Sequence, residues 1–326
     1  MGYNRDNFVR IKREFESRHF KAKDEAEARM NDLHEKIPEL KKIDEAMADI
    51  GMRLFNEALK GKDGYEARVN NIKQDQLDAL EYREQLLRYN NYPDDYTDVK
   101  YECSLCDDTG YIGIDMCVCM KKALIEAGYT SSGIGHLIRK QSFETFNLDY
   151  YKQDAATYEK MRDNFNFCKS YAKGFSADKY NNLIFFGATG LGKTHLSTAI
   201  AKVVIENGYD VMYDTAQNIF EDFQFERFGR NYQDTSESRT DKYFECDLLI
   251  IDDLGTEVAN QFTVSCLYNL LNTRINKENS TIINTNLDRN DLRKIYTDRI
   301  TSRLFGEFSA MLFKGTDIRE LKLRMK

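Results

Sequence analysis

The residues with the clearest chemical pattern lie near the middle of the chain, in the glycine-rich segment Gly187-Ala188-Thr189-Gly190-Leu191-Gly192-Lys193-Thr194. This segment fits the pattern G-x-x-x-x-G-K-T, in which backbone N–H groups converge on phosphate oxygens. Residues 182–186 predict a strand before it, and residues 194–206 predict a helix after it whose N-terminus favours an anion. We therefore expect a nucleotide-phosphate loop rather than a chance glycine-rich turn. Lys193 should reach the β- and γ-phosphates, and the Thr194 hydroxyl should bind Mg²⁺.

Two carboxylates follow a second apolar run. Leu248–Ile251 predicts a buried strand, and Asp252 and Asp253 come directly after it. In open α/β sheets, ligands bind beyond the carboxyl ends of the strands, so these acids are expected beside the phosphate loop. We predict that Asp252 holds Mg²⁺ and that Asp253 orients or deprotonates the attacking water. An ordinary Asp-Asp turn after a strand is the alternative.

Polar residues after a third apolar run complete the expected site. Thr281–Ile283 predicts a strand followed by two amides, and we expect Asn286, rather than Asn284, to contact the water or the γ-phosphate. Arg299 and Arg303 lie four residues apart on a predicted helix, so both project from one face. One of them could reach a neighbouring subunit's ATP and stabilise transition-state charge. A surface salt bridge is the alternative for this pair.

A parallel sheet is needed to bring these strand ends together. From about residue 140, short apolar runs alternate with helical stretches, and the strands are expected at 183–186, 211–213, 248–251 and 281–283. Such alternation predicts an α/β fold whose sheet is flanked by helices. We expect this nucleotide-binding domain to occupy residues 140–326.

The N-terminal region has a different character. Residues 1–92 are dense in charged residues with apolar residues such as Ile72, Leu77, Leu80 and Leu87 at helical spacing. Gly61-Lys62-Asp63-Gly64 predicts a turn between two antiparallel helices. The region is therefore expected to be an α-helical hairpin, which is either simply solvated or binds a partner through an apolar edge.

Four cysteines stand close together in residues 93–139, which we expect to be a small zinc module with a linker. Cys103-x-x-Cys106 and Cys117-x-Cys119 resemble the ligand spacing of a tetrahedral Zn²⁺ site. The C-x-C half is tight for two ligands on one metal, so His136 is a reserve fourth ligand in place of Cys119. An iron–sulfur cluster and unliganded thiols remain alternatives.

Composition restricts the classes of function. The chain of 326 residues has a formal net charge of −7, which argues against a surface coated in basic residues for duplex DNA. We find no apolar run long enough to span a membrane and no signal-peptide pattern, so a cytoplasmic protein without a membrane partner is expected. A local basic groove remains compatible with this charge.

One such groove is predicted in the long segment between the second and third strands, residues 218–243. Phe220, Phe223, Phe225, Phe228 and Tyr232 alternate there with Arg227, Arg230 and Arg239. Aromatic rings that stack on bases and arginines that hold phosphates are what single-stranded DNA binding requires. Aromatic residues at helical spacing are, however, also typical of a core. The tail residues Lys314, Lys322, Arg324 and Lys326 form a second basic candidate.

Taken together, these motifs resemble the DnaC/DnaI replicative helicase loaders of the AAA+ class and, more distantly, the IstB transposition ATPases. The resemblance rests on GATGLGKTHL, LLIIDDLG, TNL, RITSRLFG and Gly315-Thr-Asp-Ile-Arg319, and covers residues 140–326. It implies that Arg303 is the arginine finger, Asn286 the first sensor and Arg319 a second sensor on the phosphates. The full set of expected nucleotide contacts is Gly187, Ala188, Thr189, Gly190, Leu191, Gly192, Lys193, Thr194, His195, Asp252 and Arg319.

The same resemblance implies partners and an activity. It points to slow hydrolysis of Mg-ATP, to self-assembly through the ATPase domain, and to a hexameric replicative helicase held by the N-terminal part while single-stranded DNA enters. Many AAA+ ATPases have Glu at the position of Asp253, and the shorter side chain predicts slow turnover rather than inactivity. An IstB-like ATPase that serves a transposase, and an adaptor that binds ATP without turnover, are the alternatives. A small-molecule kinase is disfavoured because no arginine-rich lid is evident.

Overall fold

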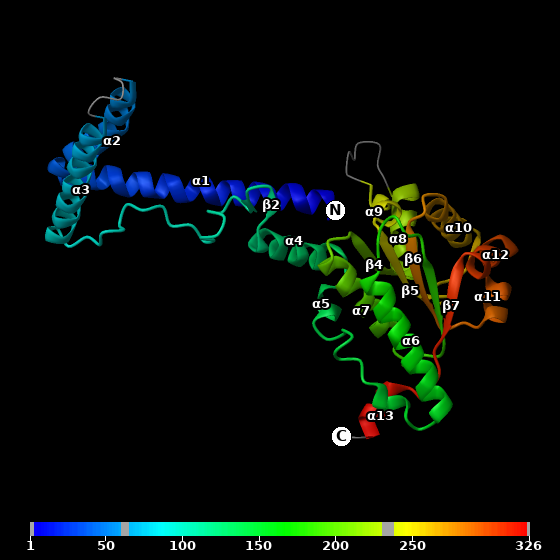
Figure 1. Cartoon of the computed structure of the whole chain (residues 1–326). Coiled ribbons are helices and arrows are strands. Elements are labelled where there is room, and N and C mark those ends of the chain that lie inside the picture. The colour runs from blue at the N-terminus through cyan, green and yellow to red at the C-terminus, as the bar shows by residue number, and fades with distance from the viewer. Residues whose placement is uncertain (1–2, 60–64, 230–237, 325–326) are drawn as a thin grey trace. The chain divides into compact units, whose positions relative to one another are not determined.

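The computed structural model of the chain describes residues 3–59, 65–229 and 238–324 (Figure 1). It divides into two compact units. One is formed by Met1–Ile11 together with Lys121–Lys326, and the other by Lys12–Met120. The domain limits expected from the sequence, at residues 92 and 139, stay a prediction.

Three long helices make up most of the described N-terminal part: α1 (Arg5–Lys36), α2 (Pro38–Leu59) and α3 (Tyr65–Tyr89). Pro38 opens α2, as suits a residue without an N–H in the first helical turn. The helices meet in a small core formed by Leu33, Ile37, Leu40 and Leu87. The predicted turn Gly61-Lys62-Asp63-Gly64 lies outside the described residues.

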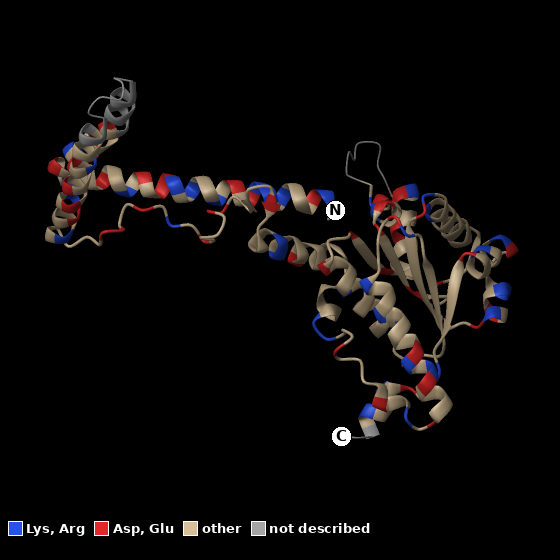
Figure 2. Cartoon of the chain, in the orientation of Figure 1, with Lys and Arg blue, Asp and Glu red and all other residues tan. Residues whose placement is uncertain are grey.

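The helical prediction for this region is confirmed, but its apolar seam is thin. Ile72 and Leu87 are buried, whereas Leu77 and Leu80 are exposed. Along α1, residues of opposite charge alternate (Figure 2), and several of them pair one turn apart, as in Lys21–Glu25 and Asp32–Lys36. Each such pair stabilises a helix by only about 0.2–0.5 kcal/mol, so many of them are needed where little apolar surface is buried.

Within the described residues, the larger unit contains a five-stranded parallel sheet in the order β4-β5-β6-β3-β7. The strands are β3 (Asn182–Phe186), β4 (Val211–Thr215), β5 (Leu248–Leu254), β6 (Ser280–Thr285) and β7 (Phe308–Leu312). The first four of these strands, β3 to β6, were predicted from the sequence. Each observed strand is one to three residues longer than the predicted range. The sequence did not predict β7, because its residues Phe308-Ser-Ala-Met-Leu312 include no β-branched residue and only Phe308 and Met311 are buried.

Helices cover both faces of this sheet. On one face, α5 (Gly135–Ile138), the 3₁₀ helix η1 (Leu148–Tyr151), α6 (Ala155–Lys173) and α7 (Lys193–Glu206) pack around a core that includes Leu183 and Phe185. On the other, α8 (Ala216–Phe228), α9 (Asp241–Glu245), α10 (Gln261–Asn276), α11 (Arg289–Ile295) and α12 (Asp298–Gly306) cover Ile184 and Phe186.

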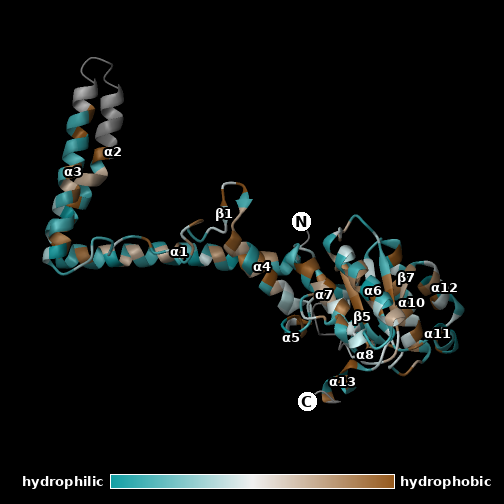
Figure 3. Cartoon of the chain, turned by 60° about the horizontal axis from the view of Figure 1, so that its bottom comes forward, coloured by the Kyte–Doolittle hydropathy of each residue, from teal (hydrophilic) through white to brown (hydrophobic). Residues whose placement is uncertain are grey.

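Two further helices, α4 (Val118–Ser131) and α13 (Ile318–Arg324), lie before α5 and after β7 in the chain. Hydrophobic residues are concentrated in the strands and on the inner sides of the helices (Figure 3). This arrangement is the expected α/β fold with a P-loop, and it places the carboxyl ends of β3, β5 and β6 side by side. In the part of the chain that the structure describes, no helix combines the length and apolar character needed to cross a bilayer.

Candidate functional site: a nucleotide pocket and a cysteine cluster

The glycine-rich segment forms a tight loop between β3 and α7. Gly192 is the residue before α7 and has φ +84°, in the left-handed region that favours glycine. A Cβ atom added to it would lie 2.9 Å from the ring of Phe146 and 3.0 Å from the Tyr151 hydroxyl. The Tyr151 hydroxyl donates a hydrogen bond to the carbonyl of Leu191 at 2.9 Å. Phe146 and Tyr151 therefore hold the loop in place. The N–H groups of the loop and the N-terminus of α7 can then bind an anion.

Lys193 is buried and points along the loop. Its Nζ donates to the carbonyls of Gly187 and Ala188 at 2.6 and 2.7 Å and to Oδ1 of Asn286 at 2.6 Å. Burial lowers the pKa of Lys193 to about 8, although nearby Asp253 and Asp252 act in the opposite direction. A phosphate group would supply the negative charge that this ammonium lacks, because an opposite charge within a few ångströms favours the charged form.

Asp252 lies below the pocket at the end of the predicted strand run and is 3% exposed. The Thr194 hydroxyl donates to its Oδ2 at 3.0 Å, and the Nδ2 atom of Asn284 donates to its Oδ1 at 2.8 Å. The Tyr213 hydroxyl also donates to Oδ2. A hydroxyl and a carboxylate at this separation form an oxygen donor set of the kind Mg²⁺ uses together with phosphate oxygens, so both predicted magnesium ligands fit the ion.

Asp253 has an unusual backbone. Its φ is +53°, which is rare for a residue with a side chain, and the pairing of β5 with β6 shifts register between Ile251 and Leu254. This irregularity turns the two neighbouring carboxylates in different directions: Asp252 into the buried network and Asp253 into the pocket. Burial and the negative charge of Asp252 raise the pKa of Asp253. A carboxylate with a raised pKa is a better proton acceptor for a water molecule.

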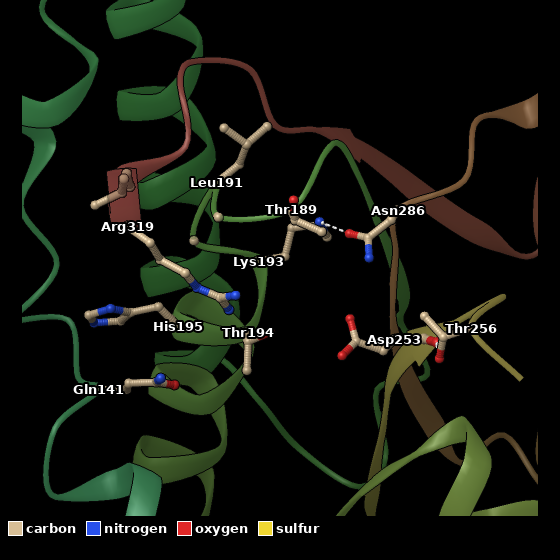
Figure 4. Close-up of a pocket in the computed structure, with 13 residues that line it drawn as sticks. Gln141, Thr189, Leu191, Lys193, Thr194, His195, Asp253, Thr256, Asn286 and Arg319 are labelled. Carbon is tan, nitrogen blue, oxygen red and sulfur yellow. Dashed lines mark hydrogen bonds between the residues drawn. The ribbon is translucent and has the colours of Figure 1, made fainter. Parts of the chain in front are cut away.

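A pocket of about 380 Å³ brings most of the predicted nucleotide contacts together. Figure 4 shows Arg319 and Asp253 on opposite sides of it, with Lys193 and Thr194 between them. Its lining contains these predicted residues: Thr189, Gly190, Leu191, Gly192, Lys193, Thr194, His195, Asp253, Asn286 and Arg319. Gln141, Thr256 and Ile318 also line it and were not predicted. Gln141 and Thr256 lie outside the quoted motifs, whereas Ile318 is part of Gly315-Thr-Asp-Ile-Arg319 but was not singled out as a contact.

His195 anchors the wall of the pocket to the segment before α6. Its Nε2 lies 2.9 Å from the carbonyl of Ser142 and 3.2 Å from Oγ1 of Thr145, and its ring packs edge-on against Phe146. Burial lowers the pKa of His195, which favours the neutral ring. These contacts hold the His195 ring in place in the wall of the pocket.

Arg303 does not line the pocket of its own chain. Its guanidinium donates twice to Oδ1 of Asn272, at 2.6 and 3.1 Å, and once to the Tyr268 hydroxyl at 3.0 Å, and it stacks over the Tyr268 ring. It is thus held by Asn272 and Tyr268 of α10, neither of which carries a carboxylate. The structure places its predicted companion Arg299 one turn earlier on α12, where its carbonyl accepts from Arg303.

The four cysteines of the second unit converge. Their sulfur atoms all lie within 4.8 Å of one another, with Cys103–Cys117 at 3.9 Å and Cys106–Cys119 at 3.5 Å. Sulfurs that are each 2.3 Å from one tetrahedral zinc lie about 3.8 Å apart. The set is therefore complete with Cys119, and His136, the predicted reserve ligand, is not part of it.

The local fold explains how a C-x-C pair fits one metal. A short hairpin of β1 (Tyr111–Ile112) and β2 (Asp115–Met116) separates the two pairs of thiols, and Cys119 lies in the first turn of α4. The carboxylate of Asp108 accepts from the N–H groups of Glu102 and Cys103. A hydrogen bond from the backbone at Leu105 and contacts with the other thiols lower the pKa of Cys103 to about 7. Burial raises the pKa of Cys119.

The fold and the site define the larger unit as an ATP-binding domain of the AAA+ P-loop class. Residues 157–305 match the family of IstB-like ATP binding proteins. A replicative helicase loader DnaC of Buchnera aphidicola subsp. Baizongia pistaciae (strain Bp) is 27% identical over 175 residues, which cover 53% of this chain and 66% of the relative. The resemblance expected from the motifs is thereby confirmed.

Two further similarities concern proteins of DNA replication. A chromosomal replication initiator protein DnaA of Aliarcobacter butzleri (strain RM4018) is 42% identical over 76 residues, 23% of this chain and 16% of the relative. A crystal structure of the DnaC helicase loader has 19% sequence identity and a TM-score of 0.46, and the match covers 55% of this chain and 99% of that chain. The chain spans just under two thirds of the length of the curated DnaC relatives that it matches.

Proposed function

We propose that this protein binds and hydrolyses Mg-ATP and uses it to load a hexameric replicative helicase onto single-stranded DNA. The observation that carries the ATPase part is the convergence of Lys193, Thr194, Asp253, Asn286 and Arg319 on one pocket, above the buried Asp252. The relatives named as DnaC helicase loaders support the choice of client.

Each residue of the pocket has a separate task in this proposal. The loop N–H groups and Lys193 hold the β- and γ-phosphates, and Thr194 and Asp252 hold Mg²⁺, which neutralises charge on the phosphate oxygens. Asp253 orients the attacking water and accepts its proton. Arg319, on the opposite side of the pocket, contacts the phosphates from α13 (Figure 4).

Single-stranded DNA binding is proposed for part of the predicted aromatic segment. Phe220 is buried and Phe223 packs against the core, so these two rings are structural. Phe225 and Phe228, near the end of α8, are 36% and 68% exposed. Arg239 lies 3.7 Å from the centroid of the Phe225 ring and Arg227 5.4 Å from that of Phe228. Exposed rings next to guanidinium groups offer stacking and phosphate contacts at one place.

The other residues that the sequence predicts as DNA contacts carry no part of this proposal. Arg230, Tyr232 and Lys326 lie outside the described residues. Lys322, on α13, lies over the ring of Tyr150. We therefore propose that the DNA contact lies at the end of α8 and that the helical region of residues 1–92 holds the helicase, with a zinc ion stabilising the small cysteine module that follows it.

The test is reconstitution with purified full-length protein. The expected result is ATP-dependent unwinding by the replicative helicase of the source organism on a circular single strand coated with single-strand-binding protein. Lys193→Ala, in which nucleotide binding should be weakened, serves as the control. ATP hydrolysis without any stimulation of the helicase, but with activation of strand transfer by a transposase, would favour the IstB-like alternative. ATP binding with no turnover under any of these conditions would favour an adaptor.

A further inference from the structure

The hydroxyl of Tyr213, on the edge strand β4, reaches Asp252 across the sheet. We propose that Tyr213 is a positioning residue that fixes the carboxylate of Asp252 for magnesium. This inference rests on the proposed function, because it assigns Asp252 to the metal of a bound nucleotide. No sequence motif includes Tyr213, and its strand was predicted only as an apolar run.

The register of the sheet explains how the contact forms. β4 and β5 are parallel, with Tyr213 opposite Ile250 and Thr215 opposite Asp252. Tyr213 and Asp252 are thus diagonal neighbours on the same face of the sheet, a separation that a long aromatic side chain can span. The Tyr213 hydroxyl is the donor in this contact, since the carboxylate of Asp252 can only accept.

The hydrogen bonds around Asp252 leave it little freedom to rotate. Oδ1 accepts from Asn284 at 2.8 Å and from the N–H of Asp253 at 3.1 Å, and Oδ2 accepts from Thr194 at 3.0 Å and from Tyr213. Thr194 would also be a magnesium ligand through an oxygen lone pair, and its O–H could still donate to Asp252. Tyr213 and Asn284 are the side-chain donors to the carboxylate that would not themselves bind the metal, one on each oxygen.

Tyr213 itself is fixed from the outer edge of the sheet. Its N–H donates to the carbonyl of Ser132 at 2.9 Å, and Ser132 is fully buried in the link between α4 and α5. Gly133, at φ +81°, packs directly on the Tyr213 carbonyl, where an added Cβ would lie 2.7 Å from the oxygen. The link between α4 and α5 therefore packs against β4 at Tyr213, and this contact helps to fix the position of the Tyr213 side chain.

A tyrosine that merely fills the core is the alternative, since a half-buried phenol needs some acceptor. The two roles differ in what Tyr213→Phe should change. The phenylalanine keeps the packing of the ring and removes only the hydrogen bond. A purely structural role predicts a loss of stability with unchanged magnesium dependence, whereas a positioning role predicts weaker binding of magnesium.

The experiment is a magnesium titration of the binding of a fluorescent, non-hydrolysable ATP analogue to the full-length protein. For Tyr213→Phe we expect the magnesium concentration at half-saturation to rise about tenfold, as is usual when a partner of a metal ligand is removed. Affinity for the analogue in EDTA should stay unchanged. Tyr171→Phe is the matched control, because it also removes one phenol hydrogen bond, to the carbonyl of Asn181 at 2.9 Å, away from the pocket.

An unchanged magnesium midpoint in Tyr213→Phe, or an equal shift in Tyr171→Phe, would overturn the inference while the proposed function stands. Wild-type protein without magnesium-dependent binding of the analogue would overturn both. Gly133→Ala tests the anchoring from a distance, since it displaces the backbone of Tyr213 without touching the pocket. It should raise the magnesium midpoint too, and a folded Gly133→Ala protein with the wild-type midpoint would contradict the anchoring.

Discussion

Lys193 Nζ lies 2.6 Å from Oδ1 of Asn286, so the cation of the phosphate loop is bonded to the amide that follows the neighbouring strand β6. Both residues line the pocket, and a γ-phosphate placed between them would contact both (Figure 4). In this structure the amide occupies a donor site on Lys193 that a phosphate oxygen would use. A bound phosphate would replace at least one of the three hydrogen bonds of Lys193 Nζ, and the bond to Asn286 joins the pocket to the end of β6.

Removing the cation and removing the proposed base should have different effects. We expect Lys193→Ala to lose nucleotide affinity by roughly 10- to 100-fold, the value of one charge-assisted hydrogen bond of about 1.5–3 kcal/mol. Asp253→Asn should bind ATP almost normally and lose about 10²-fold or more in turnover, because Asp252 remains to hold the metal. Calorimetric binding and steady-state ATPase assays measure the two quantities. Equal losses of affinity in both variants would refute this division of roles.

The ATPase rate should depend on neighbouring subunits. Arg303 does not line its own pocket but is held by Asn272 and Tyr268 on α10. If it acts on a neighbour's ATP, Arg303→Ala binds ATP normally but loses on the order of 10³-fold in turnover. Mixing Arg303→Ala with Asp253→Asn should restore partial activity, since one chain supplies the arginine and the other the carboxylate. A mixture as inactive as its parts, or full turnover in Arg303→Ala alone, would contradict a shared site.

The cysteine cluster should bind about one zinc per chain. We expect metal analysis of freshly purified, reduced protein to find it, and Cys106→Ser to lose it. Cys266→Ser is the control, because this cysteine is buried outside the cluster. His136→Ala should retain the zinc, since the four sulfurs already complete the ligand set. Removal of the metal by a chelator should lower the thermal stability of the protein, and protein without zinc and with unchanged stability would exclude the site.

Two exposed rings on α8 give a direct test of the DNA surface. Phe228→Ala should weaken the binding of a short single strand by about five- to 100-fold, as expected for the loss of one base-stacking platform of roughly 1–3 kcal/mol. The control is Phe167→Ala, which removes another exposed ring, on α6. Fluorescence anisotropy with a labelled oligonucleotide measures both. The assignment fails if the two variants bind DNA alike.

A pair of partly buried acids, Asp210 and Asp247, just before β4 and β5 should make stability depend on pH. Oδ2 of Asp247 accepts from the N–H of Asp210 at 2.8 Å. Burial raises the pKa of both carboxyl groups, although Arg274 nearby acts to lower them. The pKa values of these two carboxyl groups are higher in the folded protein than in the unfolded chain. Their contribution to the free energy of unfolding is therefore most favourable below the unfolded pKa near 4, and it falls as the pH rises through the folded-state pKa values.

Asp247→Asn keeps an acceptor for the Asp210 N–H and removes one charge. We expect it to stabilise the protein at pH 7 by on the order of 1 kcal/mol, which raises the Tm by about 2–4 °C, and to have little effect near pH 4. Glu245→Gln removes an exposed charge from the same segment and is the control. Thermal unfolding at both pH values measures the difference. A Tm at pH 7 that is unchanged or lower would contradict the expected penalty.

The sequence by itself determined the parts of this protein that depend on local pattern. The phosphate loop, the paired acids after an apolar run and the four strands could be predicted because a G-x-x-x-x-G-K-T segment and continuous apolar strands are readable over a few consecutive residues. The cysteine cluster was readable for the same reason. The strand β7 was not, because it contains no β-branched residue and Ser309 interrupts its apolar residues.

Only the tertiary structure decided how separate segments meet. The contact of Tyr213 with Asp252 depends on the register of β4 against β5, and no spacing along the chain encodes it. The fold also separated the aromatic rings of α8 into buried Phe220 and exposed Phe228, which helical spacing alone cannot do. It likewise resolved the fourth position of the cysteine set, because the β1–β2 hairpin brings Cys119 to within 3.5 Å of Cys106. Such choices depend on packing between elements distant in sequence, whose geometry exists only once the chain has folded.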